Sequence, residues 1–101
     1  MTTSLAIVRS ERVQGGRLDD IVQEGRRNIG KAYGDAGEPT EVRLDGARAL
    51  QFDYDAEGGR VRQVATLHDE HFYLLSFTAA KDAFQRRLAV MSAFMRSWRW
   101  T

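Results

Sequence analysis

Residues 40–79 decide the fold: TEVRLDGARALQFDYDAEGGRVRQVATLHDEHFYLLSFTA. Three turn signals divide this stretch, at Asp45-Gly46, at residues 56–59 (Ala-Glu-Gly-Gly) and at Asp69-Glu70. The runs between the turns cover residues 40–44, 47–55, 60–68 and 71–79, and they are rich in β-branched, aromatic and other apolar residues. Short runs joined by two-residue turns predict four consecutive antiparallel strands.

Alternation within the runs predicts what covers each strand. In residues 47–55, Leu50, Phe52 and Tyr54 point one way while Asp53 and Asp55 point the other, which is typical of a strand with one solvated face. Residues 71–79 are apolar at odd and even positions alike. We therefore expect residues 71–79 to form a central strand that is covered on both faces.

Helical spacing appears on both sides of these strands. After Gly15-Gly16, apolar residues recur at helical intervals until Gly34, which predicts a first helix. They are Leu18, Ile21, Val22, Ile29 and Tyr33. A second apolar stripe predicts a C-terminal helix with Asp82 as its N-cap. Its members are Phe84, Leu88, Met91, Met95 and Trp98, widened by Val90 and Phe94.

The apolar run Leu5-Ala-Ile-Val8 precedes the first helix and predicts a strand that is buried on both faces. The complete order is therefore β-α-β-β-β-β-α, an α+β fold with an antiparallel meander between an N-terminal and a C-terminal helix. A length of 101 residues is that of one ordinary domain, so we expect a single domain over residues 1–101.

Composition excludes several classes of function. Lys and Arg number 15 against 14 Asp and Glu, and the charges are interspersed, so nothing favours nucleic acid or an anionic membrane as a partner. The chain has no cysteine, which excludes disulfides, thiolate nucleophiles and Cys-based metal sites. It has no apolar run long enough to span a bilayer, and its start lacks the pattern of a signal peptide. We expect a cytoplasmic protein.

Two clusters resemble metal sites without completing one. His68-Asp-Glu-His71 offers two imidazoles on a predicted turn, but no third protein ligand is evident. Residues 53–58 imitate the start of a calcium loop, but Val64 stands where a bidentate Glu is required. A charged turn and a solvated hairpin explain these residues better, so we expect no metal.

Catalytic patterns are equally incomplete. Asp53 and Asp55 share a strand face, as an acid–base pair would, although a solvated face explains them better. No serine lies in a Gly-x-Ser-x-Gly turn, and no phosphate-binding glycine loop occurs. The sequence therefore predicts a protein that is not an enzyme, with no catalytic residues and no cofactor.

Two tryptophans close the sequence. Trp98 lies on the apolar stripe of the last helix, where we expect it to belong to the core. Trp100 is two residues further along, and the sequence leaves open whether it belongs to the core or anchors a protein partner.

Short motifs stand at the joints between the predicted elements. They are Ser4-Leu-Ala-Ile-Val-Arg9, Leu18-Asp-Asp-Ile, Leu44-Asp-Gly-Ala-Arg48, Gly59-Arg-Val-Arg-Gln63, Phe72-Tyr-Leu-Leu-Ser-Phe-Thr-Ala79, Phe84 and Ser97-Trp-Arg-Trp100. In this order the set resembles the PsbP-like superfamily, most closely its bacterial DcrB-like and LpqN-like branches, over nearly the whole chain. The resemblance implies an α/β/α sandwich and non-catalytic work, such as that of adaptors or chaperones for secreted effectors. The family has no shared catalytic motif.

The sequence departs from that family at its start. Relatives usually carry a further strand or hairpin ahead of the one predicted at Leu5, so the resemblance implies a shortened domain or a fragment. Without that strand, the edge near Leu5 and Ile7 would be open to a strand of a partner or of a second copy. We therefore expect a protein-binding or adaptor domain that forms a homodimer, with Leu5, Ile7 and Trp100 as candidate binding residues.

A rival hypothesis is a small-ligand-binding domain or an enzyme with a pocket between sheet and helix. Such a pocket would be lined by Tyr33, Tyr54, Tyr73 and the methionines. A roomy apolar cavity would favour this rival, whereas a solid core beside an exposed strand edge would favour the adaptor.

Overall fold

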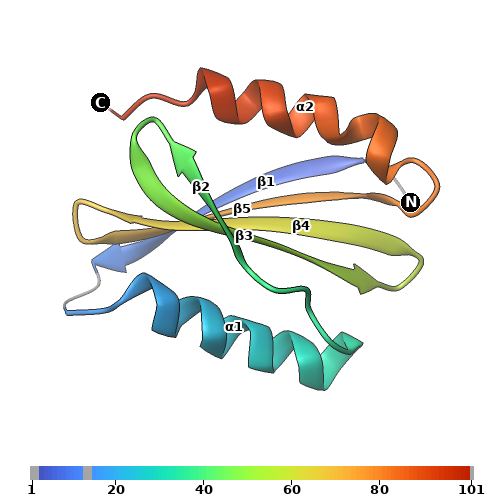
Figure 1. The fold of residues 1–101 in the computed structure, drawn as a ribbon, viewed down its shortest axis with the longest axis horizontal. Helices are drawn as coiled ribbons and strands as arrows, with labels where there is room; N and C mark the ends of the chain where they lie inside the picture. The colour runs from blue at the N-terminus through green and yellow to red at the C-terminus, as the bar shows by residue number, and fades with distance from the viewer. Residues whose placement is uncertain (1–2, 13–14, 101) are drawn as a thin grey trace.

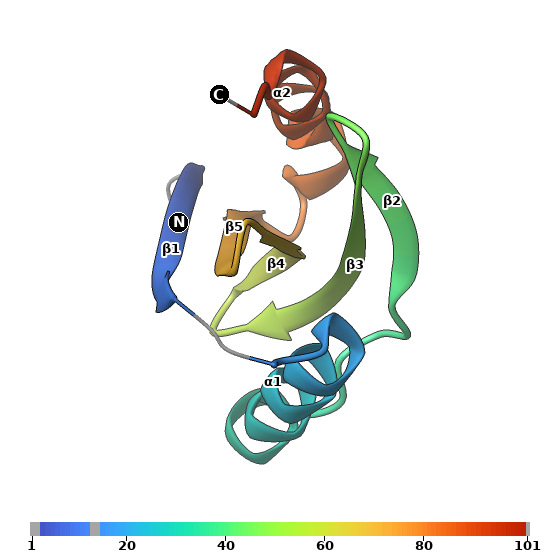
Figure 2. The ribbon, with the colours of Figure 1, turned by 90° about the vertical axis from the view of Figure 1, so that its left-hand side faces the viewer.

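The computed structural model describes residues 3–12 and 15–100. Its elements are β1 (Ser4–Arg12), α1 (Leu18–Tyr33), β2 (Thr40–Leu44), β3 (Ala47–Ala56), β4 (Gly59–His68), β5 (His71–Ala80) and α2 (Phe84–Ser97). The strands form one antiparallel sheet in the order β1-β5-β4-β3-β2. The two helices lie on opposite faces of this sheet, as Figures 1 and 2 show. The predicted α+β class and element order are confirmed.

Three two-residue turns set the register of the meander. At Asp45-Gly46 and at Asp69-Glu70 both residues have positive φ, namely 46° and 83° in the first turn and 51° and 64° in the second. Turns of this kind match the right-handed twist of the strands that they join. The third turn, at Glu57-Gly58, also has positive φ at both residues. Each hairpin signal in the sequence therefore corresponds to a turn.

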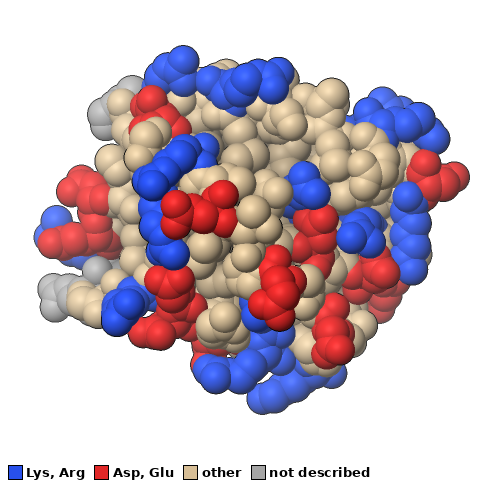
Figure 3. Space-filling model, viewed as in Figure 1, with Lys and Arg blue, Asp and Glu red and all other residues tan. Residues whose placement is uncertain are grey.

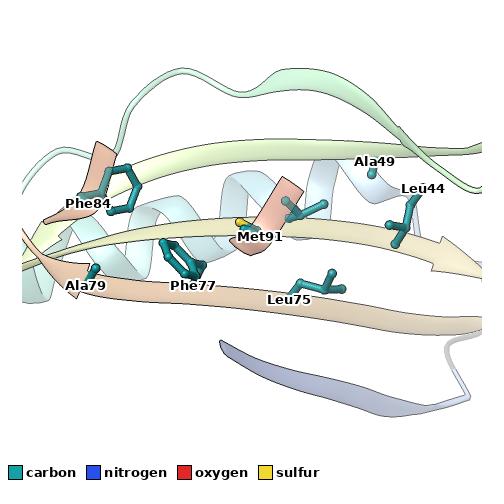
Figure 4. Packing of buried hydrophobic residues seen from close by; sticks show 8 residues of the cluster. Leu44, Ala49, Leu75, Phe77, Ala79, Phe84 and Met91 are labelled. Atoms are coloured by element: carbon teal, nitrogen blue, oxygen red, sulfur yellow. The ribbon is translucent and has the colours of Figure 1, made fainter. Parts of the chain in front are cut away.

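The core beneath α2 contains the largest buried side chains (Figure 4). Phe77 of β5 is fully buried, and its ring centroid lies 5.9 Å from that of Phe84 at the start of α2. Met91 reaches the same core from one face of the helix. The buried members of this cluster are Leu44, Ala49, Val64, Leu75, Phe77, Ala79, Phe84 and Met91.

A second, smaller core lies beneath α1. It consists of Leu18, Val22, Leu50, Phe52 and Ala65. Because α1 packs mainly on β3 and β4, it covers β5 only in part. β5 is internal to the sheet, as predicted, but the prediction that it is covered on both faces is wrong: Phe72 and Leu74 are only partly buried.

The prediction that the first strand is buried on both faces is also wrong. β1 is an edge strand, with β5 as its neighbour on one side. Ile7 is 47% exposed and Val8 is 57% exposed, although they point to opposite faces. An apolar run marks a strand, but its position within the sheet depends on segments far away in the sequence.

The last helix begins later than predicted. Residues 81–83 form a turn in which Ala83 N–H donates to Ala80 O at 2.9 Å, and the helix starts at Phe84. Asp82 is therefore not its N-cap; the N-cap position is held by Ala83, without a side-chain hydrogen bond. Val90 and Tyr33 are each 51% exposed, so the buried stripes of the two helices are narrower than their apolar patterns.

Candidate functional site

The open edge of β1 is the first candidate site. β1 pairs with β5 from Ser4 opposite Thr78 to Arg9 opposite Tyr73, and the register then shifts before Arg12. Within residues 3–12 and 15–100, no strand lies on the other side of β1. Alternate residues of an edge strand direct their N–H and C=O groups outward, where another strand can pair with them.

The side chains between Ser4 and Arg9 on this edge are all apolar. Leu5 packs against the core beneath α2, Ile7 follows it on the same face, and Val8 lies on the face that carries α1. Near the end of the strand, Arg12 Nε lies 2.7 Å from Glu70 Oε2. Leu5 and Ile7 thus lie on a strand whose outer edge is unpaired in the described part of the chain, as the sequence predicted. Their part in binding remains a prediction.

The sheet face next to β1 is incompletely covered on the side of α1. A pocket of about 280 Å³ lies between α1 and β5, and its apolar lining includes Ile21, Val22, Phe52, Phe72 and Leu74. The exposed side chain of Val8 is on the same face of the sheet, directly opposite Leu74 in the register. The open edge of β1 therefore lies next to the part of the sheet face that α1 covers incompletely.

Trp100 ties the segment after α2 to the β2–β3 hairpin. Its indole N–H donates to Leu44 O at 2.9 Å, and its backbone N–H donates to Asp45 Oδ2 at 3.0 Å. Its ring is stacked on His68 of β4. Trp100 is half-buried and has structural partners on two hairpins. Its use as an anchor for a protein partner remains a prediction.

Trp98 packs against the core beneath α2, as predicted. Its ring makes edge contacts with Tyr73, Phe94 and Trp100, with centroid distances of 6.2, 5.9 and 5.3 Å. Its Nε1 is buried and has no hydrogen-bond acceptor among the described residues. Buried donors nearly always have a partner, so this N–H is an exception that calls for an explanation.

The two histidines face each other across the β4–β5 turn, where His68 is paired with His71. His71 Nδ1 lies 3.1 Å from Ser10 O, which favours a proton on that nitrogen, while His68 is stacked on Trp100. In the part of the chain that the structure describes, no group of three His, Asp or Glu side chains is placed to hold a metal ion. That the histidines bind no metal remains a prediction.

Asp53 and Asp55 are both held in ion pairs. Asp53 receives two hydrogen bonds from Arg62, at 2.8 and 3.0 Å, and its side chain is only 19% exposed. The guanidinium carbons of Arg60 and Arg62 lie 5.5 and 5.7 Å from the centre of the Phe84 ring. The prediction of a solvated strand face is therefore wrong at Asp53, where arginine side chains and the start of α2 cover the sheet, whereas Asp55 is exposed as predicted.

Sequence reasoning missed the ion pair of Asp53 with Arg62, although a signal for it was present. A turn at residues 57 and 58 places residue 53 directly opposite residue 62, as the register shows. Opposite charges at directly paired positions stabilise each other. The hydrogen bonds that Arg62 donates to Asp53 raise the pKa of Arg62 against the opposing effect of burial, and the negative charge of Asp53 adds to the rise.

The three tyrosines do not line one pocket. Tyr33 stacks on Tyr54 with centroids 5.9 Å apart, on the side of α1, whereas Tyr73 contacts Trp98 and Trp100 on the side of α2. Burial, with a smaller contribution from Tyr33, raises the pKa of Tyr54. The lining expected from Tyr33, Tyr54, Tyr73 and the methionines is therefore wrong, because the pocket between α1 and the sheet is lined by other residues.

On the face shown in Figure 3, Lys and Arg are interspersed with Asp and Glu over most of the surface, and basic residues predominate along the upper edge, beside α2. None of the helices in the described ranges has the length and hydropathy needed to cross a bilayer.

Comparison with known proteins identifies a fold and no family. Neither a protein-family model nor a curated protein matches the chain. Among solved structures, it is similar to PA94, a protein of unknown function from Pseudomonas aeruginosa that is described there as a candidate regulator. The two chains are 13% identical, with a TM-score of 0.71 over 100% of this chain and 85% of the other. This likeness supports the fold described above.

Proposed function

We propose that this chain is a non-catalytic protein-binding domain, an adaptor or chaperone-like module, that accepts an extended segment of a partner protein along β1. The observation that carries the proposal is the edge itself: Ile7 and Val8 are 47% and 57% exposed on a strand with one open side. Added strands gain affinity from main-chain hydrogen bonds and specificity from alternate side chains.

The polar groups that the sequence offered as catalytic or metal-binding candidates support this proposal indirectly. Asp53 is engaged by Arg62, Asp55 by Arg60 and Lys81, and His68 by Trp100. These side chains have structural partners and do not converge on one reaction centre. Binding through backbone and apolar groups needs no such centre.

The resemblance to the DcrB-like and LpqN-like branches of the PsbP-like superfamily supports the same function. An antiparallel sheet with a helix on each face is the architecture that this resemblance implies. Adaptors and chaperones for secreted effectors occur in that superfamily. We propose membership and a secretion-associated role on these grounds.

The test begins with a phage-displayed library of random peptides selected against the wild-type protein. Selected peptides should bind with a measurable Kd and should slow hydrogen exchange of backbone amides in residues 5–9. Ile7→Lys should weaken binding by about tenfold or more, because a buried charge would replace an apolar contact. Val90→Lys is the matched control, since Val90 is 51% exposed, close to the 47% of Ile7, but lies on α2.

Two results would overturn the proposed function. The first is a set of selected peptides whose binding is indifferent to Ile7→Lys. The second is exchange protection confined to other elements of the protein.

A further inference from the structure

A pocket of about 340 Å³ lies at the end of the sheet, beside the last paired residues of β1. It is assembled from three places that are distant in sequence: β1, the β4–β5 hairpin and the segment at the end of α2. Its aromatic lining consists of His68, His71, Tyr73, Trp98 and Trp100, and its charged lining of Arg9, Asp69 and Arg99.

The aromatic walls of this pocket support one another. The Tyr73 ring lies 5.1 Å from that of Trp100 and 6.2 Å from that of Trp98, in edge contacts. His71, whose ring meets Tyr73 at 6.5 Å, is held by the carbonyl oxygen of Ser10. Rings fixed by several neighbours form a wall that needs little ordering when a ligand enters.

The fixed charge of the pocket is positive. Arg9 and Arg99 contribute guanidinium groups, and Asp69 contributes one carboxylate. Arg99 Nη1 already donates to Arg96 O and Trp98 O. Arg9 makes no ion pair within the described ranges. Its five N–H donors are therefore available to an acceptor.

We infer that this pocket is a subsite for a carboxylate, which Arg9 binds against the aromatic walls. A guanidinium fork matches a carboxylate with two parallel hydrogen bonds. Two guanidinium groups against one carboxylate leave one net positive charge, which a singly charged carboxylate neutralises and a doubly charged phosphate exceeds. The ring of Trp98 lines the pocket, while its Nε1 is buried, so the ring and not its N–H is what the pocket presents to a ligand.

The position of Arg9 connects the subsite with the strand edge. Arg9 lies opposite Tyr73, at the last pair before the register shift in β1. A segment that pairs with the open side of β1 brings one of its residues beside Arg9. The carboxylate is then an acidic side chain or the C-terminus of that segment. This assignment of its source rests on the proposed function, whereas the chemistry of the pocket does not.

Small probes test the pocket without any partner. Benzoate, its neutral analogue benzamide and inorganic phosphate are titrated while the indole N–H signals of Trp98 and Trp100 are followed by NMR. Benzoate should shift these signals saturably with a Kd of about 1 mM, as expected for a ligand of its size. Benzamide should bind about tenfold more weakly, because it lacks the charge that Arg9 recognises.

Variants then assign the effect to Arg9. Arg9→Gln should weaken benzoate binding about tenfold, while Arg87→Gln, at an exposed position on α2, should leave it unchanged. The amide spectrum of each variant reports whether it is folded. Equal shifts with benzamide, tighter binding of phosphate, or an Arg9→Gln variant that binds benzoate like the wild type would each overturn the inference.

Selected peptides identify the source of the carboxylate. Each peptide is compared with a form that carries a C-terminal amide and with a form in which its acidic residue is replaced by the amide. If only one of the two altered forms binds the wild-type protein more weakly than the parent peptide, the group changed in that form is the source of the carboxylate. The Arg9→Gln variant should bind that form and the parent peptide equally well. If peptides pair with β1, but benzoate does not bind and removal of a peptide carboxylate does not change the affinity, the inference of a carboxylate subsite is wrong and the proposed function stands. If benzoate binds but no peptide uses β1, the proposed function is wrong and the pocket stands.

Discussion

The imidazole of His68 and the indole of Trp100 are stacked with their centroids 3.8 Å apart and their planes inclined by 13°. The same indole donates its N–H to Leu44 O. Trp100, in the segment that follows α2, therefore bridges the end of β4 and the end of β2, which are separated by β3 in the sheet. This bridge gives Trp100 a structural role that can be measured apart from any binding.

Replacing Trp100 should therefore affect stability. Trp100→Ala should lower the free energy of unfolding by about 1–3 kcal/mol, less than a fully buried aromatic residue because Trp100 is half-buried. Trp100→Phe keeps a ring but loses the hydrogen bond to Leu44 O, and should cost about 1 kcal/mol. Urea denaturation measures both. An alanine variant as stable as the wild type would favour the partner-anchor alternative.

The centre of the fold should be the core beneath α2. Phe77 is 0% exposed, so Phe77→Ala should cost about 3–5 kcal/mol, enough to unfold a marginally stable domain. Leu88 is only partly buried, and Leu88→Ala should cost less. Val90→Ala serves as the control, with an expected change within about 0.5 kcal/mol. Thermal melts in which Phe77→Ala behaves like the control would contradict this assignment of the core.

A pH-dependent contribution should come from Asp19. Arg48 donates hydrogen bonds to both of its carboxylate oxygens, at 3.0 and 3.2 Å, and lowers its pKa in the folded protein. A lowered pKa stabilises the folded state above the unfolded value of about 3.9, and this contribution disappears as the pH falls through the lowered value.

Wild type and Asp19→Asn should therefore differ in melting temperature at pH 5–7 and converge as the pH falls below about 4. High salt should reduce the difference, because both side chains are about half exposed. Asp20→Asn is a neighbouring control. A difference that persisted unchanged at the lowest pH would show that the ion pair is not its cause.

The histidine pair should bind no metal of consequence. Zinc or nickel should leave the melting temperature unchanged, because His68 and His71 lack a third ligand among the described residues. A site occupied at a hundredfold over its Kd would add about 2.7 kcal/mol. A saturable rise that vanished in His68→Ala would reveal a site after all.

Self-association through β1 is expected in the absence of a partner. Two copies that join their β1 edges about a two-fold axis would form one continuous sheet. Sedimentation at micromolar concentration should detect a dimer, which Ile7→Lys should dissociate and Val90→Lys should not. A wild-type protein that sediments as a monomer throughout would contradict the homodimer.

Local signals predicted most of this fold, and non-local arrangement explains what they missed. Asp45-Gly46 and Asp69-Glu70 fixed the hairpins because a two-residue turn leaves one register available. The start of α2 was misplaced because Asp82 is a good N-cap by type, whereas the chain uses residues 81–83 for a turn. The exposure of Ile7 and Val8 depends on which strands lie beside β1, and the sequence pattern of residues 4–12 does not predict those neighbours.

The candidate sites divide in the same way. The ion pair between Asp53 and Arg62 follows from the strand register alone, so it could have been predicted from the sequence. The pocket near Arg9 could not be predicted from the sequence, because its walls come from β1, the β4–β5 hairpin and the segment at the end of α2. Only the packed structure brings Tyr73, Trp98 and Arg9 to one place.

The pairing of β1 with β5 also has a consequence for folding during synthesis. The β2–β3, β3–β4 and β4–β5 hairpins are each contiguous in the chain, so each can form as soon as it leaves the ribosome. Ser10 of β1, in contrast, meets Phe72 and His71 across separations of 62 and 61 positions. β1 is therefore synthesised well before β5, and the edge of Leu5-Ala-Ile-Val8 that pairs with β5 cannot do so until β5 has left the ribosome.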